Sequence, residues 1–484
     1  MELSMTMLLL FLFCIVSYLR KIFLQRRDQS CYMLAYECYK PGEDRKLDTD
    51  TCAKLIMRNR NLGLPEYRFL LRTMANSGIG EETYGPKNVI AGREASPNLA
   101  DALSEVDDIM FDTLDKLFAR TGVSPSEIDI LIVNVSLFSP ASSLTARIIN
   151  RYKMRNNIKA VNLAGEGCSA SMVAIDLVHQ MFKTNNNAYA IVVSTESIGP
   201  NWYNGKEKSM MLSNLLFRSG GCSTLLTNKP ALKDQAIMKL KCSARTHIGS
   251  DDEAYGCCIQ VEDNKGYPGF LLTKKLPKSG AKAFILNLQV LLPKVLPLRE
   301  LIRSVAKASL AKNKTKNSTL EAIAADLNLK SGIEHFCIHP GGKAVIDELG
   351  KSLGLSEYDI EPSKMTLHRF GNTSSGGLWY TLGYMEAKKR LKKGDRIFMI
   401  SLGAGFMCNN CVWEVTRDLD DPNVWKDCLD KYPVKSTVNP FMEKYDWIND
   451  DNIDLNSIDM VWLQNKLGFQ VDDPETIERI RNTP

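Results

Sequence analysis

Cys168 stands in a sequence context that suits a thiol nucleophile. It follows a short apolar run, 160–163, and a turn with Gly165 and Gly167, and it precedes a mainly apolar segment, 169–182. This order predicts a strand, a tight turn and a buried helix that begins just after the thiol. Unpaired N–H groups and the positive end of the helix dipole favour a thiolate at such a position. We therefore interpret Cys168 as a reactive nucleophile, although many free cysteines are simply buried.

His339 and Asn372 also stand in turns next to predicted elements. His339 comes where a strand breaks at Pro340 and two glycines, and Asn372 lies in the sequence GNTSS, which opens a helix. A thiolate can hold an acyl group as a thioester, and His and Asn donors can stabilise the enolate formed when a malonyl thioester loses carbon dioxide. The same residue types would serve a Cys–His–Asn protease, in which Asn orients the His.

The remaining histidines and cysteines do not form a metal-site pattern. The chain has five histidines, of which His335 and His339 are four apart, but their segment is strand-like and ends at Pro340. Cys408 and Cys411 form one C-x-x-C, and no second pair follows at the spacing of a zinc site. We therefore expect no metal ion.

Composition indicates an ordinary globular protein. Hydrophobic residues make up 44% and charged residues 24% of the 484 positions, which suffice for two domains or two similar halves. A net charge of +5 is small for this length and gives no reason to expect nucleic acid. Thirteen scattered cysteines favour a reducing compartment.

Predicted strands and helices alternate along the chain, which favours an α/β core with parallel strands. The order of the second half repeats that of the first, so Cys168 and the turn around Asn372 each stand at the start of a central helix. This arrangement favours condensing chemistry over proteolysis. We predict helices at 101–119, 140–148, 169–182, 343–353 and 373–391, and strands at 128–135, 160–163, 188–194, 334–339 and 396–402.

The N-terminus carries an apolar run, Met5 to Leu19, followed by four basic residues between positions 20 and 27. The charge follows the apolar run and no cleavage site is present, so we predict an uncleaved membrane anchor with the rest of the chain in the cytosol. The segment 311–318 is polar and basic, as in a surface loop. The expected divisions are the anchor at 1–30, a half with the nucleophile at 31–240, a half with His and Asn at 241–437, and an acidic tail at 438–484.

Several long motifs resemble those of the plant 3-ketoacyl-CoA synthases, the condensing enzymes of very-long-chain fatty acid elongation. The resemblance covers most of the chain, from about Cys31 to Val415. The motifs that carry it are NLAGEGCSA (162–170), LVHQMFKTNNNAYAIVVSTES (177–197), SMMLSNLLFRSGG (209–221), RTHIGSDD (245–252), HFCIHPGGKAVIDEL (335–349) and FGNTSSGGLWYTLGYMEAKKRLKKGDRI (370–397).

The resemblance implies a thiolase-like fold of two similar βαβ-type halves, layered α/β/α/β/α, behind a membrane-anchor helix. It implies that Cys168 accepts the acyl group and that His339 and Asn372 serve decarboxylation and condensation. Further family histidines match three positions whose roles stay open, namely His247, His335 and His368.

By the same resemblance the substrates are a long-chain acyl-CoA and malonyl-CoA, and no metal or nucleotide cofactor is used. A homodimer is implied at the endoplasmic reticulum membrane, with its active site facing the cytosol. Its partners would be a ketoacyl reductase, a hydroxyacyl dehydratase and an enoyl reductase. We expect the acyl tunnel to be lined partly by 201–218.

Some features depart from the family pattern. Only one apolar segment precedes the core, where most members have two. Glu166 stands where Met is usual, and its carboxylate could oppose the thiolate and raise the pKa of Cys168. Gly376 and Gly377 replace part of a serine run, and the tail is longer than expected.

Three other readings stay open. A type III polyketide synthase shares the Cys, the HPGG sequence and the GN turn, but that family is shorter and has no anchor. A degradative thiolase needs a second catalytic Cys, for which Cys408 and Cys411 are placed only by position. A non-catalytic paralogue could bind elongase subunits or acyl-CoA. Glycosylation can test the predicted membrane topology, because asparagines in N-x-Ser/Thr sequences accept glycans only on the lumenal side. Four asparagines lie in such sequences: Asn134, Asn313, Asn317 and Asn372.

Overall fold

The computed structural model describes residues 30–59, 61–303, 328–437, 439 and 465. The predicted anchor within 1–29, the loop at 311–318 and nearly all of the tail lie outside these residues. Within the described part of the chain, no helix has both the length and the apolar character needed to cross a membrane.

The described residues form one mixed sheet of nine strands in the order β3-β2-β4-β5-β1-β6-β11-β10-β9, and a separate hairpin of β7 and β8. The sheet contains the same pattern twice, once running inward from β2 and once running inward from β9. The series β2-β4-β5-β1 and β9-β10-β11-β6 each contain one parallel pair followed by two antiparallel pairs. The strands are β1 (Tyr32–Cys38), β2 (Ile130–Asn134), β3 (Lys159–Leu163), β4 (Tyr189–Thr195), β5 (Gly221–Thr227), β6 (Met238–His247), β7 (Cys258–Glu262), β8 (Pro268–Leu272), β9 (His335–Ile338), β10 (Arg396–Gly403) and β11 (Met407–Val415).

This topology confirms the repeated order of elements and corrects the expectation of parallel strands. Among the described strands, only β2–β3, β2–β4 and β9–β10 are parallel. The turn between β10 (Arg396–Gly403) and β11 (Met407–Val415) is too short for the long crossover that a parallel neighbour requires, and β5 returns antiparallel to β4 after a longer connection that contains α8. The sheet is therefore mixed.

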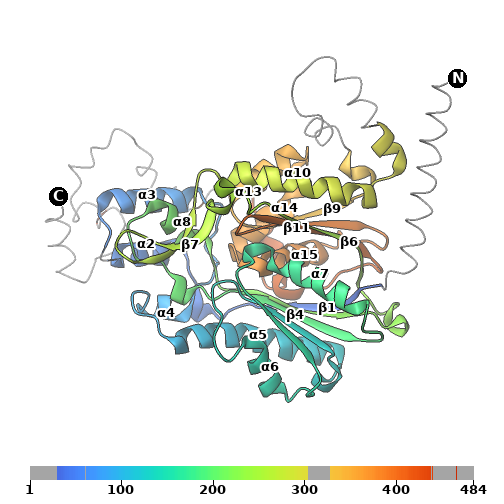
Figure 1. The fold of residues 1–484 in the computed structure, drawn as a ribbon. Coiled ribbons are helices and arrows are strands. Elements are labelled where there is room, and N and C mark those ends of the chain that lie inside the picture. Colours follow the sequence, from blue (N-terminus) through green and yellow to red (C-terminus); the bar gives the residue numbers. More distant parts are fainter. Residues whose placement is uncertain (1–29, 60, 304–327, 438, 440–464, 466–484) are drawn as a thin grey trace.

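The helices form layers around the sheet (Figure 1). Helices α5 and α6 cover the outer face of the first strand series, and α10 covers that of the second. Between the two series lie α7, which contacts β4, β2, β11 and β6, and α15, which contacts β9 and β1. The longer helices are α2 (Thr49–Arg58), α3 (Leu64–Asn76), α5 (Leu99–Thr121), α6 (Leu144–Tyr152), α7 (Ala170–Phe182), α8 (Lys208–Leu216), α10 (Leu276–Val295), α13 (Lys343–Ser352), α14 (Glu357–Phe370) and α15 (Gly377–Ala387).

The two central helices are buried to different extents. Every residue of α15 is buried, as its apolar sequence requires. The first six residues of α7 are buried, but Gln180 near its end is exposed, so the prediction of a helix buried on all faces holds only for the N-terminal part. The largest hydrophobic cluster joins both helices to the facing strands. This core fixes the N-terminal ends of α7 and α15, where Cys168 and Asn372 stand.

Candidate active site

Cys168 lies in a 3-10 turn, Gly167–Ser169, that leads directly into α7. Gly167 has φ +59, and a Cβ there would lie 2.5 Å from the backbone nitrogen of Ala404, so only glycine fits. The hydroxyl of Ser401 donates to the Cys168 carbonyl at 3.1 Å. The end of β10 and the loop that follows it thus hold the nucleophile turn in place.

His339 follows β9, and its backbone N–H donates to the carbonyl of Ile400 at 2.9 Å. The side chain is buried, and neither ring nitrogen has a hydrogen-bond partner among the described atoms. Burial lowers the pKa of His339 to about 4, so the imidazole is neutral at physiological pH. A neutral ring carries one donor and one acceptor nitrogen, both free to meet a substrate.

The backbone around Asn372 is tied to α8 and to the turn that follows. Its N–H donates to the carbonyl of Leu216 at 3.0 Å, and its side-chain oxygen accepts from the Ser374 N–H at 2.8 Å. That second bond leaves the amide nitrogen as the donor that faces the cavity. It donates to the Gly341 carbonyl at 3.3 Å and also hydrogen-bonds the Cys168 thiol.

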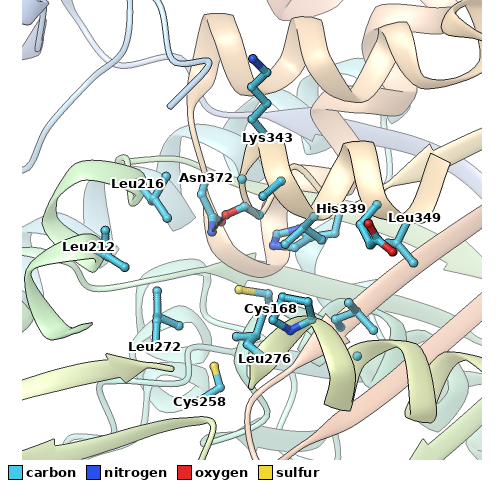
Figure 2. Close-up of a pocket in the computed structure, with 18 of the residues that line it drawn as sticks. Cys168, Leu212, Leu216, Cys258, Leu272, Leu276, His339, Lys343, Leu349 and Asn372 are labelled. Carbon is cyan, nitrogen blue, oxygen red and sulfur yellow. Dashed lines mark hydrogen bonds between the residues drawn. The ribbon is translucent and has the colours of Figure 1, made fainter. Parts of the chain in front are cut away.

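These three side chains line one cavity of about 810 Å³ (Figure 2). In Figure 2, Cys168, His339 and Asn372 point toward one another from three different elements. The cavity extends along α8, β8, α10 and α13, and its walls there are mostly apolar. These wall residues include Leu212, Leu216, Phe217, Phe270, Leu272, Leu276, Phe284, Leu288 and Leu349. Of the predicted tunnel segment 201–218, the residues in this wall are Leu212, Leu216 and Phe217.

The thiol is protonated in the resting site. Burial raises the pKa of Cys168 to about 12, the hydrogen bond from Ser374 lowers it, and the negative charge of Glu196 raises it further. Desolvation therefore outweighs the helix N-terminus that was expected to favour a thiolate. Glu196, and not Glu166 as expected, is the carboxylate that acts on Cys168.

The other three histidines that were predicted as site residues do not line the cavity. The His335 ring meets Asp395 at 2.9 Å, the His368 ring meets the Tyr432 hydroxyl at 2.9 Å, and His247 accepts from the Gly249 N–H at 3.0 Å. Each has a partner that explains its place in the fold, and any catalytic role for them stays a prediction.

Sequence reasoning missed Ser374 and Glu196, which lie beside the thiol. The Ser374 hydroxyl is 3.8 Å from Cys168 Sγ and 3.3 Å from a carboxylate oxygen of Glu196. Ser374 lies in the sequence GNTSS and Glu196 in the sequence STES, both within motifs quoted above. Their contact depends on how the two halves pack, so no spacing along the chain indicates it.

Comparison with known proteins identifies the family. A family model described as FAE1/Type III polyketide synthase-like protein matches residues 23–315, and one described as 3-Oxoacyl-[acyl-carrier-protein (ACP)] synthase III C terminal matches 324–415. The chain is 63% identical over 460 residues to 3-ketoacyl-CoA synthase 19 of Arabidopsis thaliana, covering 94% of this chain and 99% of that protein. The chain belongs to the 3-ketoacyl-CoA synthase family. A second Arabidopsis member, 3-ketoacyl-CoA synthase 12, is 53% identical and covers 93% of this chain and 98% of its own length.

Solved structures support the fold of this 3-ketoacyl-CoA synthase family member. It matches 1,3,6,8-tetrahydroxynaphthalene synthase, a type III polyketide synthase from Streptomyces coelicolor, with a TM-score of 0.61 and 17% identity, covering 80% of this chain and 99% of that chain. It also matches CsyB complexed with CoA-SH, with a TM-score of 0.62 and 17% identity over 80% and 100%. At this identity the likeness shows a shared thiolase-like α/β fold. The polyketide synthase interpretation is supported by this shared fold and by the family model over residues 23–315, whose description names both groups.

Proposed function

We propose that this chain condenses a long-chain acyl-CoA with malonyl-CoA to give a 3-oxoacyl-CoA, carbon dioxide and free CoA. The observation that carries the proposal is the convergence of Cys168, His339 and Asn372 on one largely apolar cavity. Family membership points to the same reaction. All three residues of the set are in place, which favours an enzyme over a non-catalytic paralogue.

The reaction has two stages. Cys168 loses its proton and attacks the acyl thioester, which forms an acyl-cysteine and releases CoA as a thiol. Malonyl-CoA then loses carbon dioxide, and the enolate oxygen accepts hydrogen bonds from the His339 ring N–H and the Asn372 amide. The enolate carbon attacks the acyl-cysteine carbonyl, which forms the new carbon–carbon bond and releases Cys168 as a thiolate. Burial lowers the pKa of His339 to about 4, so its imidazole is neutral. A neutral imidazole still carries one N–H, which can donate to the enolate oxygen.

The cavity walls suit an apolar chain and a charged carrier. Leucine and phenylalanine side chains from α8, β8, α10 and α13 would bury the acyl chain. Three basic residues on the cavity wall are suited to the phosphates of CoA, namely Arg72, Lys274 and Lys343.

We also propose that the chain forms a homodimer through strand β3. This strand ends the sheet in the described residues, and Lys159 and Ala160 on it are exposed. An unpaired strand edge is a template for pairing with a second chain. The Asn162 side-chain oxygen is buried without a partner among the described atoms, and a second copy could supply a donor.

We further propose that the chain is anchored at the endoplasmic reticulum membrane with its catalytic part in the cytosol. The apolar run at 5–19 and the basic residues after it support this topology. A ketoacyl reductase, a hydroxyacyl dehydratase and an enoyl reductase would complete each two-carbon round. Glycans on Asn313 or Asn317 would overturn the cytosolic placement.

The test is condensation by microsomes that contain the full chain, supplied with C16 to C24 acyl-CoAs and labelled malonyl-CoA. Labelled 3-ketoacyl product is expected from the wild type and from Cys408→Ala, and none from Cys168→Ala. Loss of product in Cys408→Ala at normal protein level would favour thiolase-type chemistry. Absence of product from the wild type at every chain length would contradict the proposal.

A further inference from the structure

The backbone of Asn372 is held by the segment that follows α8. Its N–H donates to the Leu216 carbonyl at 3.0 Å, and its own carbonyl accepts from the Arg218 N–H at 2.9 Å. These two bonds make an isolated parallel bridge between Phe217 and Asn372. The segment belongs to the half of the chain that carries the nucleophile, whereas Asn372 belongs to the other half. The position of Asn372 therefore depends on where α8 ends.

The C-terminus of α8 is completed by Asn372 and by the side chain of Arg218. The last carbonyls of a helix have no partner within the helix and need donors from elsewhere. The Leu216 carbonyl accepts from the Asn372 N–H. The Arg218 guanidinium supplies the next donors, from Nη1 to the Phe217 carbonyl at 2.8 Å and to the Asn214 carbonyl at 3.3 Å. One arginine thus fixes the turn that carries the bridge to Asn372.

The Arg218 side chain is a buried cation, with 1% of its surface exposed. Its Nε donates to the Thr83 hydroxyl at 2.9 Å, and its Nη2 contacts Cys52 Sγ at 3.6 Å. In the part of the chain that the structure describes, no carboxylate forms an ion pair with Arg218. A buried charge is costly unless it is compensated, and the negative end of the α8 dipole provides that compensation. The guanidinium therefore ties the end of α8 to Thr83.

The aliphatic part of Arg218 packs against the residue before Asn372. Gly371 has φ +67, and a Cβ built there would lie 2.3 Å from Arg218 Cγ and 3.0 Å from Arg218 Cβ. Only glycine allows this close approach. Arg218 thus contacts Gly371 through its side chain and Asn372 through its backbone N–H.

We propose that Arg218 is a positioning residue that sets the Asn372 amide for the decarboxylation of malonyl-CoA. This inference rests on the proposed function, in which that amide donates to the enolate oxygen. The Cys168 turn and His339 have a different support, because the Ser401 hydroxyl and the Ile400 carbonyl of β10 hold them. Loss of the guanidinium should therefore move Asn372 more than the other two.

The proposal predicts that the two stages of the reaction respond differently. Transfer of the acyl group from CoA to Cys168 does not use the donors that stabilise the enolate. In decarboxylation the bond to the carboxylate carbon breaks, carbon dioxide leaves, and the electron pair forms the enolate whose oxygen needs the Asn372 amide. A misplacement of about 1 Å in an active site costs roughly 100-fold in rate.

The experiment measures the two stages separately with purified full-length protein. Acyl transfer is followed as acylation of the Cys168 peptide by mass spectrometry, with a long-chain acyl-CoA alone. Decarboxylation is followed as labelled carbon dioxide released from malonyl-CoA by the acylated enzyme. Arg218→Met keeps an apolar side chain beside Gly371 and loses every guanidinium donor. It should release carbon dioxide about 100-fold more slowly and acylate Cys168 at close to the wild-type rate.

A double variant tests whether Arg218 acts through Asn372. In Asn372→Ala the positioned amide is absent, so adding Arg218→Met should cause no further loss of carbon dioxide release. Arg218→Lys should recover only part of the rate, because lysine keeps the charge without the planar fork of donors. Thr83→Val removes the acceptor of Nε and should lower carbon dioxide release about tenfold, which gives a milder variant if Arg218→Met folds poorly.

Arg45→Met is the matched control, because Arg45 is also buried, pairs with Asp108 and does not line the cavity. Its thermal stability should fall while both rates stay at the wild-type level. Equal losses of both rates in Arg218→Met, or a further loss in the Asn372→Ala background, would overturn the proposal. A wild type that acylates Cys168 but releases no carbon dioxide would instead contradict the proposed function, so the two failures are distinguishable.

Discussion

Replacing Gly167 by alanine should displace the nucleophile with little else changed. Gly167 has φ +59, and a Cβ there would lie 2.5 Å from the Ala404 backbone nitrogen. An ordinary contact begins near 3.4 Å, so the backbone must shift by about 1 Å. Cys168 is the next residue and shares this shift. A misplacement of about 1 Å in an active site costs roughly 100-fold in rate.

Gly165→Ala separates backbone strain from the clash. Gly165 has φ +77 in the same turn, and nothing lies within 4 Å of a Cβ built there. Both variants incur about 1–2 kcal/mol of left-handed strain. Only Gly167→Ala adds the collision with the loop after β10. Gly165→Ala should therefore lose some thermal stability and keep its rate.

The assay is the initial rate of labelled 3-ketoacyl product per mole of folded protein, with thermal unfolding followed alongside. We expect the Gly167→Ala rate to be about 100-fold below that of Gly165→Ala. Equal rates for the two variants would refute the reasoning that the loop after β10 positions Cys168.

Three further predictions concern other parts of the molecule. Burial raises the pKa of Glu386 from 4.5 to about 7, so the neutral carboxyl group favours the folded state and this stabilisation is lost as the pH rises from 4.5 through 7. By thermal unfolding, Glu386→Gln should be more stable than the wild type by about 2 kcal/mol at pH 8 and equally stable at pH 5. The side chain of Gly280→Leu should project into the cavity and reduce activity on the longest accepted acyl-CoA at least about tenfold. Gly280→Ala, whose Cβ makes ordinary contacts, should keep the wild-type range of acyl chain lengths. An unchanged range of chain lengths in Gly280→Leu would place the acyl chain elsewhere. Asn162→Pro should dissociate the proposed dimer, as measured by size-exclusion chromatography. The backbone groups of Lys159 and Leu163 hydrogen-bond on the side of β2, so the N–H of residue 162 points to the outer edge of the sheet, and proline removes it. A dimer that persists would exclude the β3 edge as the dimer interface.

The sequence predicted the site because each of its parts has a local signature. Cys168, His339 and Asn372 all stand where glycines end a strand or open a helix. The chemistry of the set and the repeated order of elements then placed them at one centre, and the structure puts all three on one cavity. Local patterns sufficed here because the backbone turns are themselves encoded by glycine.

Other features could not be predicted from local patterns. Helix α14 (Glu357–Phe370) contains Pro362, which disfavours a helix interior, and the packing of the second half overrides it. The strand β11 carries Asn409 and Asn410, both buried and hydrogen-bonded, so its sequence lacks the usual apolar character. Such polar pairs are satisfied only by tertiary contacts.

The protonation state of the nucleophile is a further case. The sequence indicated a thiolate, because the helix N-terminus is visible in the pattern and the depth of burial is not. The structure shows that desolvation dominates the pKa of Cys168 and that the negative charge of Glu196 raises this pKa further. The contact of Glu196 with Ser374 joins residues 178 positions apart, so only the folded chain reveals it.

The most direct test of the account is to trap the acyl-enzyme. The full-length protein would be incubated with a long-chain acyl-CoA in the absence of malonyl-CoA, and its peptides would be measured by mass spectrometry. The account predicts the mass of one acyl group on the Cys168 peptide, and its loss as 3-ketoacyl product when malonyl-CoA is added. An acyl group on another residue, or an unmodified Cys168 while product forms, would contradict it.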